Sequence, residues 1–320
     1  MEGARHSKKT QAATTLLPTY VTKFQSMFAK KDFDILPEHC KWDHTIKLIP
    51  EVEPKSSKVY FLFLLKQAEL DVFLEENLHT RWIWPSKSPI AAPVFFIKKK
   101  DSLLQLVQDY CILNTITVKN RYPFPLIFKL VSQLRGAKYF IKLDVHWGFN
   151  NICIRPRDEW KAAFYTNWGL FEPLIMFFGI TNSLATFQTM INDIFRTLIA
   201  KGIVVVYLDD ILIFTKTEEE HEQTVQRVLE ILAEYKLFLH PEKCEFHQKQ
   251  IKYLGLVISE NKVVMNSVKV TRVYNWPTPE NQTDMQAFIG FVNFYRCFIR
   301  DFSTIARPLF DLTYSNKAWN

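Results

Sequence analysis

The sequence predicts an α+β fold in which strands and helices follow one another in β-α-β-β-α-β order, the split βαβ arrangement. Two runs rich in β-branched residues, 203–206 and 211–214, predict short buried strands joined by a tight turn. A third apolar run, 140–145, predicts a strand upstream of them. Helices are predicted over 183–199, between these strands, and from Thr217 onward.

Both helices are predicted from spacing and capping. Apolar side chains recur at helical spacing in the first segment, at Phe187, Ile191, Ile194, Phe195 and Leu198, so one face of the helix should pack against the sheet. The second helix opens with a capping box at Thr217-Glu218-Glu219-Glu220. The acidic start suits the positive N-terminal end of the helix, so these glutamates need no role in metal binding.

The N-terminal part of the chain is expected to form a smaller strand and helix unit. Residues 1–40 are weakly patterned and are expected to be a loosely ordered leader. The pattern over 66–79 predicts a helix after an apolar run at 58–65, and 92–97 predicts a strand that leads into a cluster of three lysines at 98–100. Such a cluster is also typical of a solvated hairpin edge.

The C-terminal part is predicted to be a strand followed by helices. Residues 252–258 predict one strand, and residues 266–275 predict a helix. The segment Trp276-Pro277-Thr278-Pro279 interrupts the helical pattern, and a second helix, capped at Thr283, should follow.

Composition is compatible with a nucleic-acid partner and does not require one. The chain of 320 residues has a formal charge of +7 and a pI near 9.0, and 48% of it is hydrophobic, enough for two or three subdomains. No apolar stretch is long enough to span a bilayer, and the N-terminus lacks the apolar segment of a secretory signal. An intracellular protein, cytoplasmic or nuclear and not secreted, is therefore expected.

Cysteine usage favours a reducing compartment. The five cysteines are odd in number and widely scattered, which is typical of free thiols. His240, Cys244 and His247 form the one cluster whose spacing suggests metal ligands. Structural zinc sites need four ligands, so these three are expected to be ordinary turn and strand residues.

Three carboxylates point to metal chemistry. Asp209 and Asp210 are adjacent between two apolar strands, where each raises the pKa of the other and both lose hydration. A solvated Asp-Asp turn is the simpler reading, but a divalent cation would remove the penalty, and carboxylates suit Mg²⁺. Asp144 ends the upstream strand and could complete a two-metal site for in-line phosphoryl transfer.

A collinear series of motifs resembles the reverse transcriptase of Gypsy-type long-terminal-repeat retrotransposons, which are relatives of the retroviral enzyme. The central motifs are Lys142-Leu143-Asp144, Asp158-Glu159-Trp160-Lys161-Ala162-Ala163-Phe164, Phe178-Gly179-Ile180-Thr181-Asn182, Ala185-Thr186-Phe187-Gln188 and Tyr207-Leu208-Asp209-Asp210. Flanking motifs are Trp42-Asp43-His44-Thr45-Ile46, Pro85-Ser86-Lys87-Ser88-Pro89, Asn120-Arg121-Tyr122-Pro123, Tyr253-Leu254-Gly255, Trp276-Pro277-Thr278-Pro279, Phe294-Tyr295-Arg296 and Ala306-Arg307-Pro308-Leu309. The resemblance covers nearly everything from residue 43 to residue 313.

The resemblance implies a right-hand polymerase with fingers, a split βαβ palm and the start of a helical thumb or connection segment. The implied boundaries are a leader at 1–40, fingers and the start of the palm at 41–135, palm with primer grip at 136–258, and thumb or connection at 259–320. The implied activity is RNA-directed DNA synthesis from dNTPs, with an RNA or DNA template and a DNA or RNA primer.

The resemblance also assigns roles to residues. Asp144, Asp209 and Asp210 would be catalytic and would hold two Mg²⁺ ions, for which Mn²⁺ could substitute. Lys99 would reach the triphosphate, and Phe178 and Gly179 would line the nucleotide pocket. Phe149 would lie under the sugar, where its ring would exclude a ribose 2′-hydroxyl. Tyr253, Leu254 and Gly255 would grip the primer terminus.

Several positions depart from the pattern of this family. Gln105 stands where an arginine usually grips the triphosphate, and glutamine lacks the charged fork for bidentate phosphate binding. Further replacements fall at Cys111, Ile112, Phe177 and Leu184, and a glycine expected near Asp101 is missing. The chain has 8 glycines, where average usage would give about 22. Substituted turn glycines cost stability wherever φ must be positive.

Three functional hypotheses follow. The first is an active RNA-directed DNA polymerase, favoured by the intact carboxylates. The second is a catalytically impaired retrotransposon remnant that only binds nucleic acid, favoured by the changes in the fingers. The third is a binding module of the RNA-recognition type, whose sheet shares the same strand order. Because the printed chain stops shortly after the thumb motif at 306–309, a polymerase-only fragment without ribonuclease H is expected.

Overall fold

A four-stranded antiparallel sheet in the order β7-β8-β4-β9 forms the centre of the molecule. The computed structural model describes residues 18–28, 35–52, 64–98, 104–125, 130, 132–314 and 319. The strands are β4 (Tyr139–Asp144), β7 (Val204–Tyr207), β8 (Asp210–Thr215) and β9 (Glu245–Gln248). Helices α5 (Ser183–Ile194) and α6 (Arg196–Ala200) connect β4 to β7, and α7 (Glu218–Glu234) follows β8, so the predicted β-α-β-β-α-β order is confirmed.

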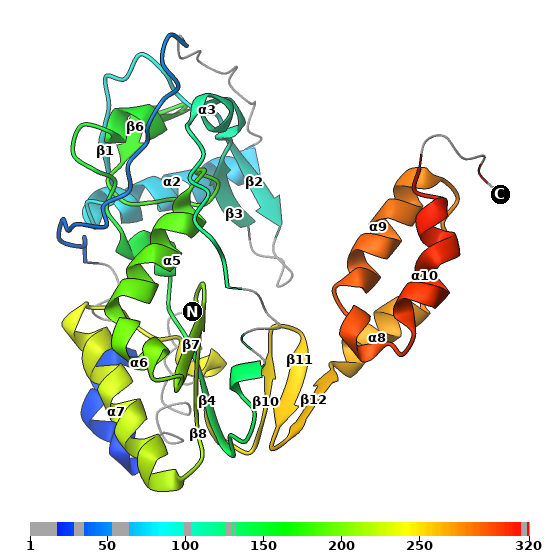
Figure 1. Ribbon diagram of the computed structural model, residues 1–320. Coiled ribbons are helices and arrows are strands. Elements are labelled where there is room, and N and C mark those ends of the chain that lie inside the picture. The colour runs from blue at the N-terminus through cyan, green and yellow to red at the C-terminus, as the bar shows by residue number, and fades with distance from the viewer. Residues whose placement is uncertain are drawn as a thin grey trace.

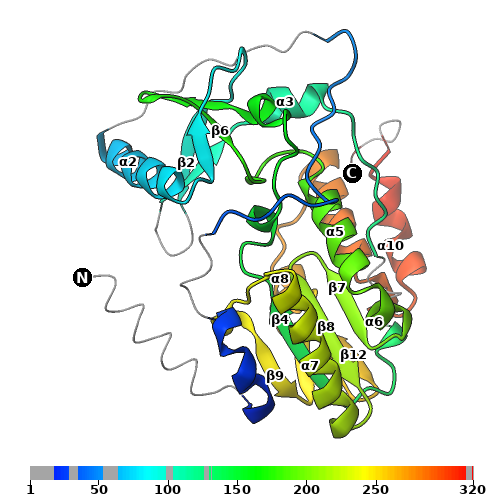
Figure 2. The same ribbon diagram turned by 90° about the vertical axis from the view of Figure 1, so that its left-hand side faces the viewer.

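The two faces of this sheet belong to different cores. Side chains alternate along β4 and β8, so their odd-numbered residues such as Ile141 and Leu143 pack with the helices, and Figure 2 shows α5, α6 and α7 over that face. Even-numbered residues of these two strands, such as Phe140 and Leu212, pack instead with the C-terminal strands. Asp144 and Asp210 have even numbers, so they lie on the face away from the helices.

The helix predicted over 183–199 is kinked. Phe195 has φ −98° and ψ 11°, which separates α5 from α6, although the i to i+4 hydrogen bonds continue on both sides. The fully buried Phe195 ring anchors the kink in the core. The helix start predicted at Thr217 is confirmed, because the Thr217 side chain is the N-cap and accepts a hydrogen bond from the Glu220 N–H at the start of α7.

A second unit lies above the central sheet in Figure 1 and has its own core. It contains α2 (Leu64–His79), β1 (Ile83–Pro85), β2 (Val94–Lys98), β3 (Leu104–Gln108), α3 (Cys111–Ile116), β5 (Phe164–Thr166) and β6 (Gly169–Pro173), with the 3₁₀-helices η3 (Gly148–Asn151) and η4 (Glu159–Ala162) nearby. The strands form a β2-β3 hairpin and a β1-β6-β5 sheet. The predicted helix at 66–79 and strand at 92–97 are confirmed, whereas Lys99 lies outside the described residues.

The single strand predicted over 252–258 is wrong. The chain reverses at Leu254 and Gly255, whose φ angles are 50° and 80°, so that Tyr253 pairs with Leu256. After the short η5 (Pro241–Lys243) and β9, a three-stranded sheet forms from β10 (Gln250–Tyr253), β11 (Leu256–Ser259) and β12 (Lys262–Met265). The sequence pattern concealed this turn because apolar residues continue through it.

A helical unit ends the chain. It contains α8 (Ser267–Tyr274), α9 (Gln282–Asn293), the 3₁₀-helix η6 (Arg296–Phe298) and α10 (Phe302–Asp311), and stands apart from the upper unit in Figure 1. The helix predicted over 266–275 is confirmed, with Asn266 as its cap. The second helix is capped by Asn281, which accepts from the Asp284 N–H, and not by Thr283 as predicted.

A 3₁₀-helix, η1 (Thr19–Phe28), occupies part of the segment expected to be a leader. Its side chains Val21, Met27 and Phe28 are buried in the same core as α7. The sequence did not predict this packing, because the segment is short and its apolar residues do not follow a clear period. No helix within the described ranges is long and apolar enough to cross a membrane.

Candidate active site

The β7–β8 hairpin and strand β4 bring the three predicted carboxylates to one end of the sheet. Tyr207 pairs with Asp210, which leaves Leu208 and Asp209 as the two turn residues, and Leu208 has a φ of 54°. Asp144 is the direct cross-strand partner of Asp210. The Val145 N–H donates to the Asp209 carbonyl oxygen at 2.9 Å and fixes the turn against the end of β4.

Asp209 has the least favourable environment of the three. Its Oδ1 is buried and has no hydrogen-bond partner among the described residues. Burial raises the pKa of Asp209 to about 6, and the charges of Asp144 and Asp210 contribute further, while Lys243 acts in the opposite direction. An ionised carboxylate in this position needs a positive partner to offset its lost hydration.

Two lysines neutralise the other two carboxylates. Lys142 Nζ lies 2.9 Å from Asp210 Oδ1, and Lys243 Nζ lies 3.1 Å from Asp144 Oδ1. Neither lysine was predicted as a site residue. Lys142 could have been found, because it precedes Asp144 by two strand positions and so shares its face. Lys243 comes from η5, and nothing in the local sequence places it there.

A buried glutamine fixes the turn from the other side. Gln188 on α5 is fully buried, and its Oε1 accepts from the Leu208 N–H at 2.9 Å. Its Nε2 donates to Asn192 Oδ1 at 2.9 Å and to the Val206 carbonyl oxygen at 3.4 Å. A neutral side chain therefore holds the hairpin without adding charge beside Asp209.

The residues present fit divalent cations. Asp144, Asp209 and Asp210 offer only carboxylate oxygens, which are the ligands of Mg²⁺ and Mn²⁺. The Oδ1 of Asp209 has no hydrogen-bond partner among the described residues and is therefore available as a metal ligand. Asp210 and Asp144 each form one ion pair with a lysine, which a bound cation can replace. All three residues come from strand ends and one tight turn, so little reorganisation is needed.

Three of the residues predicted to bind the nucleotide lie together, and one of them, Phe149, directly follows Gly148, which lies against Asp209. Phe149 in η3 is 8% exposed, and its ring centroid lies 5.5 Å from those of both Phe178 and Phe187. Phe178 is half-exposed, and Gly179 has a φ of 96°, a region that favours glycine. Asn114 Nδ2 donates to the Gly179 carbonyl oxygen at 2.7 Å, which ties this loop to α3. The structure thus brings Phe149, Phe178 and Gly179 together.

The predicted primer-grip residues form the β10–β11 turn. Tyr253 is buried, and its hydroxyl donates to the Asp210 carbonyl oxygen at 3.4 Å, so the turn is linked directly to the carboxylate hairpin. Burial, followed by the Asp210 and Tyr207 charges, raises the pKa of Tyr253 well above its ordinary range. A Cβ on Gly255 would lie 3.2 Å from the Tyr295 hydroxyl, so this turn also contacts the helical unit.

The other sequence cluster of histidine and cysteine does not form a ligand set. His247 Nε2 lies 3.1 Å from Glu218 Oε1, and the His240 ring is tilted by 54° against the His146 ring, with centroids 5.0 Å apart. Cys244 is a free thiol. His240 and Cys244 flank η5, and His247 lies within β9.

Comparison with known proteins identifies the class. A family model described as "Reverse transcriptase (RNA-dependent DNA polymerase)" matches residues 97–258, the range that contains the carboxylates and the central sheet. The sheet, its helices and its carboxylate hairpin therefore define a polymerase of the right-hand α+β type. The chain belongs to the reverse transcriptase family. A binding module of the RNA-recognition type is thereby set aside.

Relatives extend the match beyond that range. The Transposon Tf2-3 and Tf2-7 polyproteins of Schizosaccharomyces pombe (strain 972 / ATCC 24843) are each 34% identical over 304 residues, 95% of this chain. The chain spans 23% of the length of these polyproteins. Assignment to the Gypsy-type subclass remains a prediction.

Solved structures confirm the fold. A foamy viral protease-reverse transcriptase in complex with an RNA/DNA hybrid matches with a TM-score of 0.79 and 20% identity, over 98% of this chain and 44% of that one. The foamy viral protease-reverse transcriptase in complex with dsDNA matches with a TM-score of 0.82 and 19% identity, over 98% and 68%.

Proposed function

We propose that this chain is an RNA-directed DNA polymerase in which Asp144, Asp209 and Asp210 are the catalytic metal ligands. The observation that carries the proposal is the buried, unpartnered Oδ1 of Asp209, which faces two further carboxylates at one end of the sheet. A buried carboxylate that is ionised at neutral pH lowers the stability of the fold unless a cation binds to it.

The chemistry follows from the ligands. Two Mg²⁺ ions, or Mn²⁺, would lower the pKa of an attacking primer 3′-hydroxyl and neutralise charge on the departing pyrophosphate. The protein itself positions the metal ligands. Hydrogen bonds from Val145 and to Gln188 hold the turn, so that Asp209 is in place before substrate binds. Lys142 and Lys243 limit the repulsion among the three carboxylates while no cation is bound.

The remaining predicted roles are parts of the same proposal. Phe149, wedged between Phe178 and Phe187, would lie under the deoxyribose, and Phe178 with Gly179 would form the floor of the pocket. Lys99 would contact the triphosphate. The turn at Tyr253, Leu254 and Gly255 would hold the primer end, because the Tyr253 hydroxyl connects it to Asp210.

The partners would be an RNA or DNA template, a DNA or RNA primer, and dNTPs. The foamy viral relatives of this fold were solved with an RNA/DNA hybrid and with dsDNA. The charge of +7 favours binding of a polyphosphate backbone, and that binding should weaken as salt rises.

Primer extension tests the proposal. The protein is given poly(rA)/oligo(dT), dTTP and either Mg²⁺ or Mn²⁺, and the same reaction is run with Asp209→Asn and Asp210→Asn. Extension by the wild-type chain that both substitutions abolish is expected. Glu219→Gln, an exposed change in the first turn of α7, serves as the control and should leave extension unchanged. Extension that survives Asp209→Asn would contradict the assignment.

A second candidate function is nucleic-acid binding without efficient synthesis. It is favoured by Gln105, which lies half-exposed on β3 opposite Ile97 and cannot supply a charged fork to a triphosphate. Binding of a labelled primer–template, measured alongside extension, separates the two functions. Tight, salt-dependent binding with no extension in either metal would favour the impaired remnant.

A further inference from the structure

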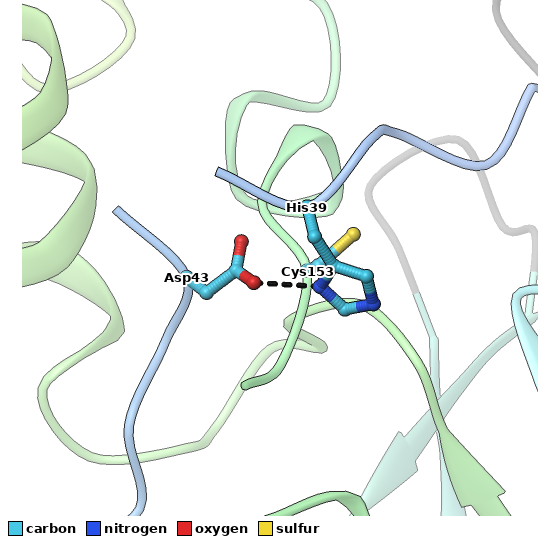
Figure 3. Close-up of side chains that lie close together, drawn as sticks. All are labelled: His39, Asp43 and Cys153. Carbon is cyan, nitrogen blue, oxygen red and sulfur yellow. Dashed lines mark hydrogen bonds and ion pairs between the residues drawn. The ribbon is translucent and has the colours of Figure 1, made fainter. Parts of the chain in front are cut away.

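A second cluster of potential metal ligands lies outside the carboxylate site. His39, Asp43 and Cys153 each offer one ligand atom, and these three atoms lie within 4.8 Å of one another. Figure 3 shows the His39 ring and the Asp43 carboxylate meeting beside the Cys153 thiol, from two segments far apart in the sequence. His39 Nδ1 lies 2.6 Å from Asp43 Oδ2, and Cys153 Sγ donates to the Pro37 carbonyl oxygen at 3.2 Å.

Cys40 lies in the same turn, but its thiol is not one of the three clustered ligand atoms. Its backbone N–H donates to Asp43 Oδ1 at 2.9 Å, and its thiol is exposed. The clustered ligand atoms are therefore one nitrogen, one oxygen and one sulfur, which leaves a fourth coordination position for water.

The backbone around this cluster is already ordered. The Asp43 N–H donates to the Cys40 carbonyl oxygen at 3.1 Å and closes the turn that carries two of the ligands, His39 and Asp43. The next residue, His44, donates its N–H to the Cys153 carbonyl oxygen at 2.8 Å, which locks the two segments together. Lys41 forms an ion pair with Asp193 at 2.6 Å and holds the turn against α5. Ligands on a preordered frame need little entropy loss to bind an ion.

We propose that His39, Asp43 and Cys153 bind one zinc-class divalent ion in tetrahedral coordination, with a water as the fourth ligand, at a site separate from the catalytic carboxylates. Thiolate and imidazole ligands select Zn²⁺ over Mg²⁺, and three protein ligands with a water in the fourth position are a common form of zinc coordination. The site does not depend on the proposed polymerase function, because none of its residues is a catalytic carboxylate.

The geometry requires only small movements. Tetrahedral zinc with bonds of about 2.0–2.3 Å places its ligand atoms about 3.3–3.8 Å apart. The three atoms that already lie within 4.8 Å would converge by about 1 Å, while the His39–Asp43 contact at 2.6 Å would open by a similar amount. His39 is on the surface, and it borders a cavity together with Pro37 and Cys40, so an ion can reach the cluster.

Binding of the ion releases one thiol proton. Burial raises the pKa of the Cys153 thiol to about 12, so it carries its proton when no ion is bound. The Cys153 sulfur loses this proton to the buffer as its bond to zinc forms, and His39 binds through its neutral ring. No electron is transferred.

A bound ion would cross-link the turn at 39–43 to the segment that follows η3. Cys153 follows η3, the 3₁₀-helix that carries Phe149, and is the cross-strand partner of Ile175. A bound ion would join the turn at 39–43 to this segment and so stiffen the backbone behind Phe149. Stability should therefore rise with added zinc, as for any ligand that binds only the folded chain.

Cobalt binding tests the proposal. The chelator-treated, reduced full chain is titrated with Co²⁺ and then Zn²⁺ in excess Mg²⁺, which occupies the carboxylate site. A tetrahedral visible spectrum with a thiolate charge-transfer band, one ion per chain and displacement by Zn²⁺ is the expected result. Oxygen-only coordination gives no charge-transfer band. Thermal unfolding of the same samples should show a zinc-dependent increase in Tm.

Variants separate this site from general metal binding. Cys153→Ser should remove the charge-transfer band, but Cys153 is 2% exposed and the substitution also disturbs the core. His39→Ala is an exposed change that leaves packing intact, and it should weaken Zn²⁺ binding by about 100-fold or more. Cys297→Ser and Cys111→Ser, both exposed and outside the cluster, should bind as the wild type does.

Two outcomes would overturn the proposal. One is a wild-type chain that binds no Co²⁺ or Zn²⁺ with sulfur coordination, which would leave His39 and Asp43 as an ion pair and Cys153 as a buried hydrogen-bond donor. The other is metal binding that survives His39→Ala and Cys153→Ser unchanged. Neither outcome bears on primer extension, so failure here is distinguishable from failure of the polymerase assignment.

Discussion

Gly148 lies directly against the Asp209 carboxylate. A Cβ built on Gly148 would stand 2.2 Å from Asp209 Oδ1 and 2.7 Å from the Phe187 ring. The carboxyl oxygen that lacks a hydrogen-bond partner therefore occupies the space that any other residue at 148 would fill. The absence of a side chain at 148 allows η3, which also carries Phe149, to pack against the turn that carries Asp209.

Gly148→Ala is expected to abolish primer extension and to reduce the free energy of unfolding by about 1–3 kcal/mol, because an added methyl group overpacks the core. Asp209 or the Phe187 ring must move to make room. Extension assays and urea unfolding measure the two effects. Gly290→Ala in α9 is the matched control, since nothing lies within 4 Å of a Cβ there. That change should stabilise by up to about 1 kcal/mol and leave extension unchanged.

Asp209→Asn is expected to stabilise the metal-free protein while it removes activity. The folded-state pKa of Asp209, about 6, lies above the ordinary value of 3.8. The folded chain therefore holds this proton more tightly than the unfolded chain, and stability is lost as pH rises from about 4 through about 6. Above that range the ionised group costs about 1–3 kcal/mol, which asparagine avoids.

The dependence on pH and on Mg²⁺ shows whether the stabilisation comes from removal of the Asp209 charge. The stability difference between wild type and Asp209→Asn should be small near pH 4 and reach a plateau above pH 6, as measured by urea unfolding. Saturating Mg²⁺ should stabilise the wild type and not the variant. Asp210→Asn, which loses the ion pair with Lys142 at 2.9 Å, should not stabilise. A pH-independent difference would contradict the burial of Asp209.

The β7–β8 hairpin could be predicted from the sequence because the signals for it lie within a few residues of the turn. The apolar runs around Asp209 and Asp210 and the capping box at Thr217 each specify a structure within a few residues. The turn at Leu254 and Gly255 was missed because its apolar neighbours continue the strand pattern on both sides. Contacts between distant segments were missed too. Lys243 on Asp144, and Cys153 beside His39, depend on the tertiary fold and leave no mark in local periodicity.

Phe149→Leu is expected to raise ribonucleotide incorporation relative to deoxynucleotide incorporation. Its ring is held between Phe178 and Phe187 beside the carboxylate turn, where it would meet a 2′-hydroxyl. Single-nucleotide competition between dNTP and rNTP measures the ratio. Phe187→Leu is the control, because that ring is fully buried beneath Phe149 and should lose stability without changing the ratio. An unchanged ratio in Phe149→Leu would make Phe149 a core residue only.

Gln105→Arg is expected to lower the KM for dNTP by about ten- to a hundredfold, the equivalent of one charge-assisted contact of about 1.5–3 kcal/mol. Gln105 lies on β3 of the β2–β3 hairpin, opposite Ile97, and is half-exposed, so an arginine can be accommodated without burying charge. Because the contact would be made to the triphosphate before and during the reaction, kcat should change less than KM. Gln105→Lys is the matched comparison: it adds the same charge without the bidentate fork, so its effect on KM should be smaller. If the KM of Gln105→Arg equals that of the wild type, triphosphate binding is limited elsewhere, and the replaced positions Phe177 and Leu184 become the next ones to restore.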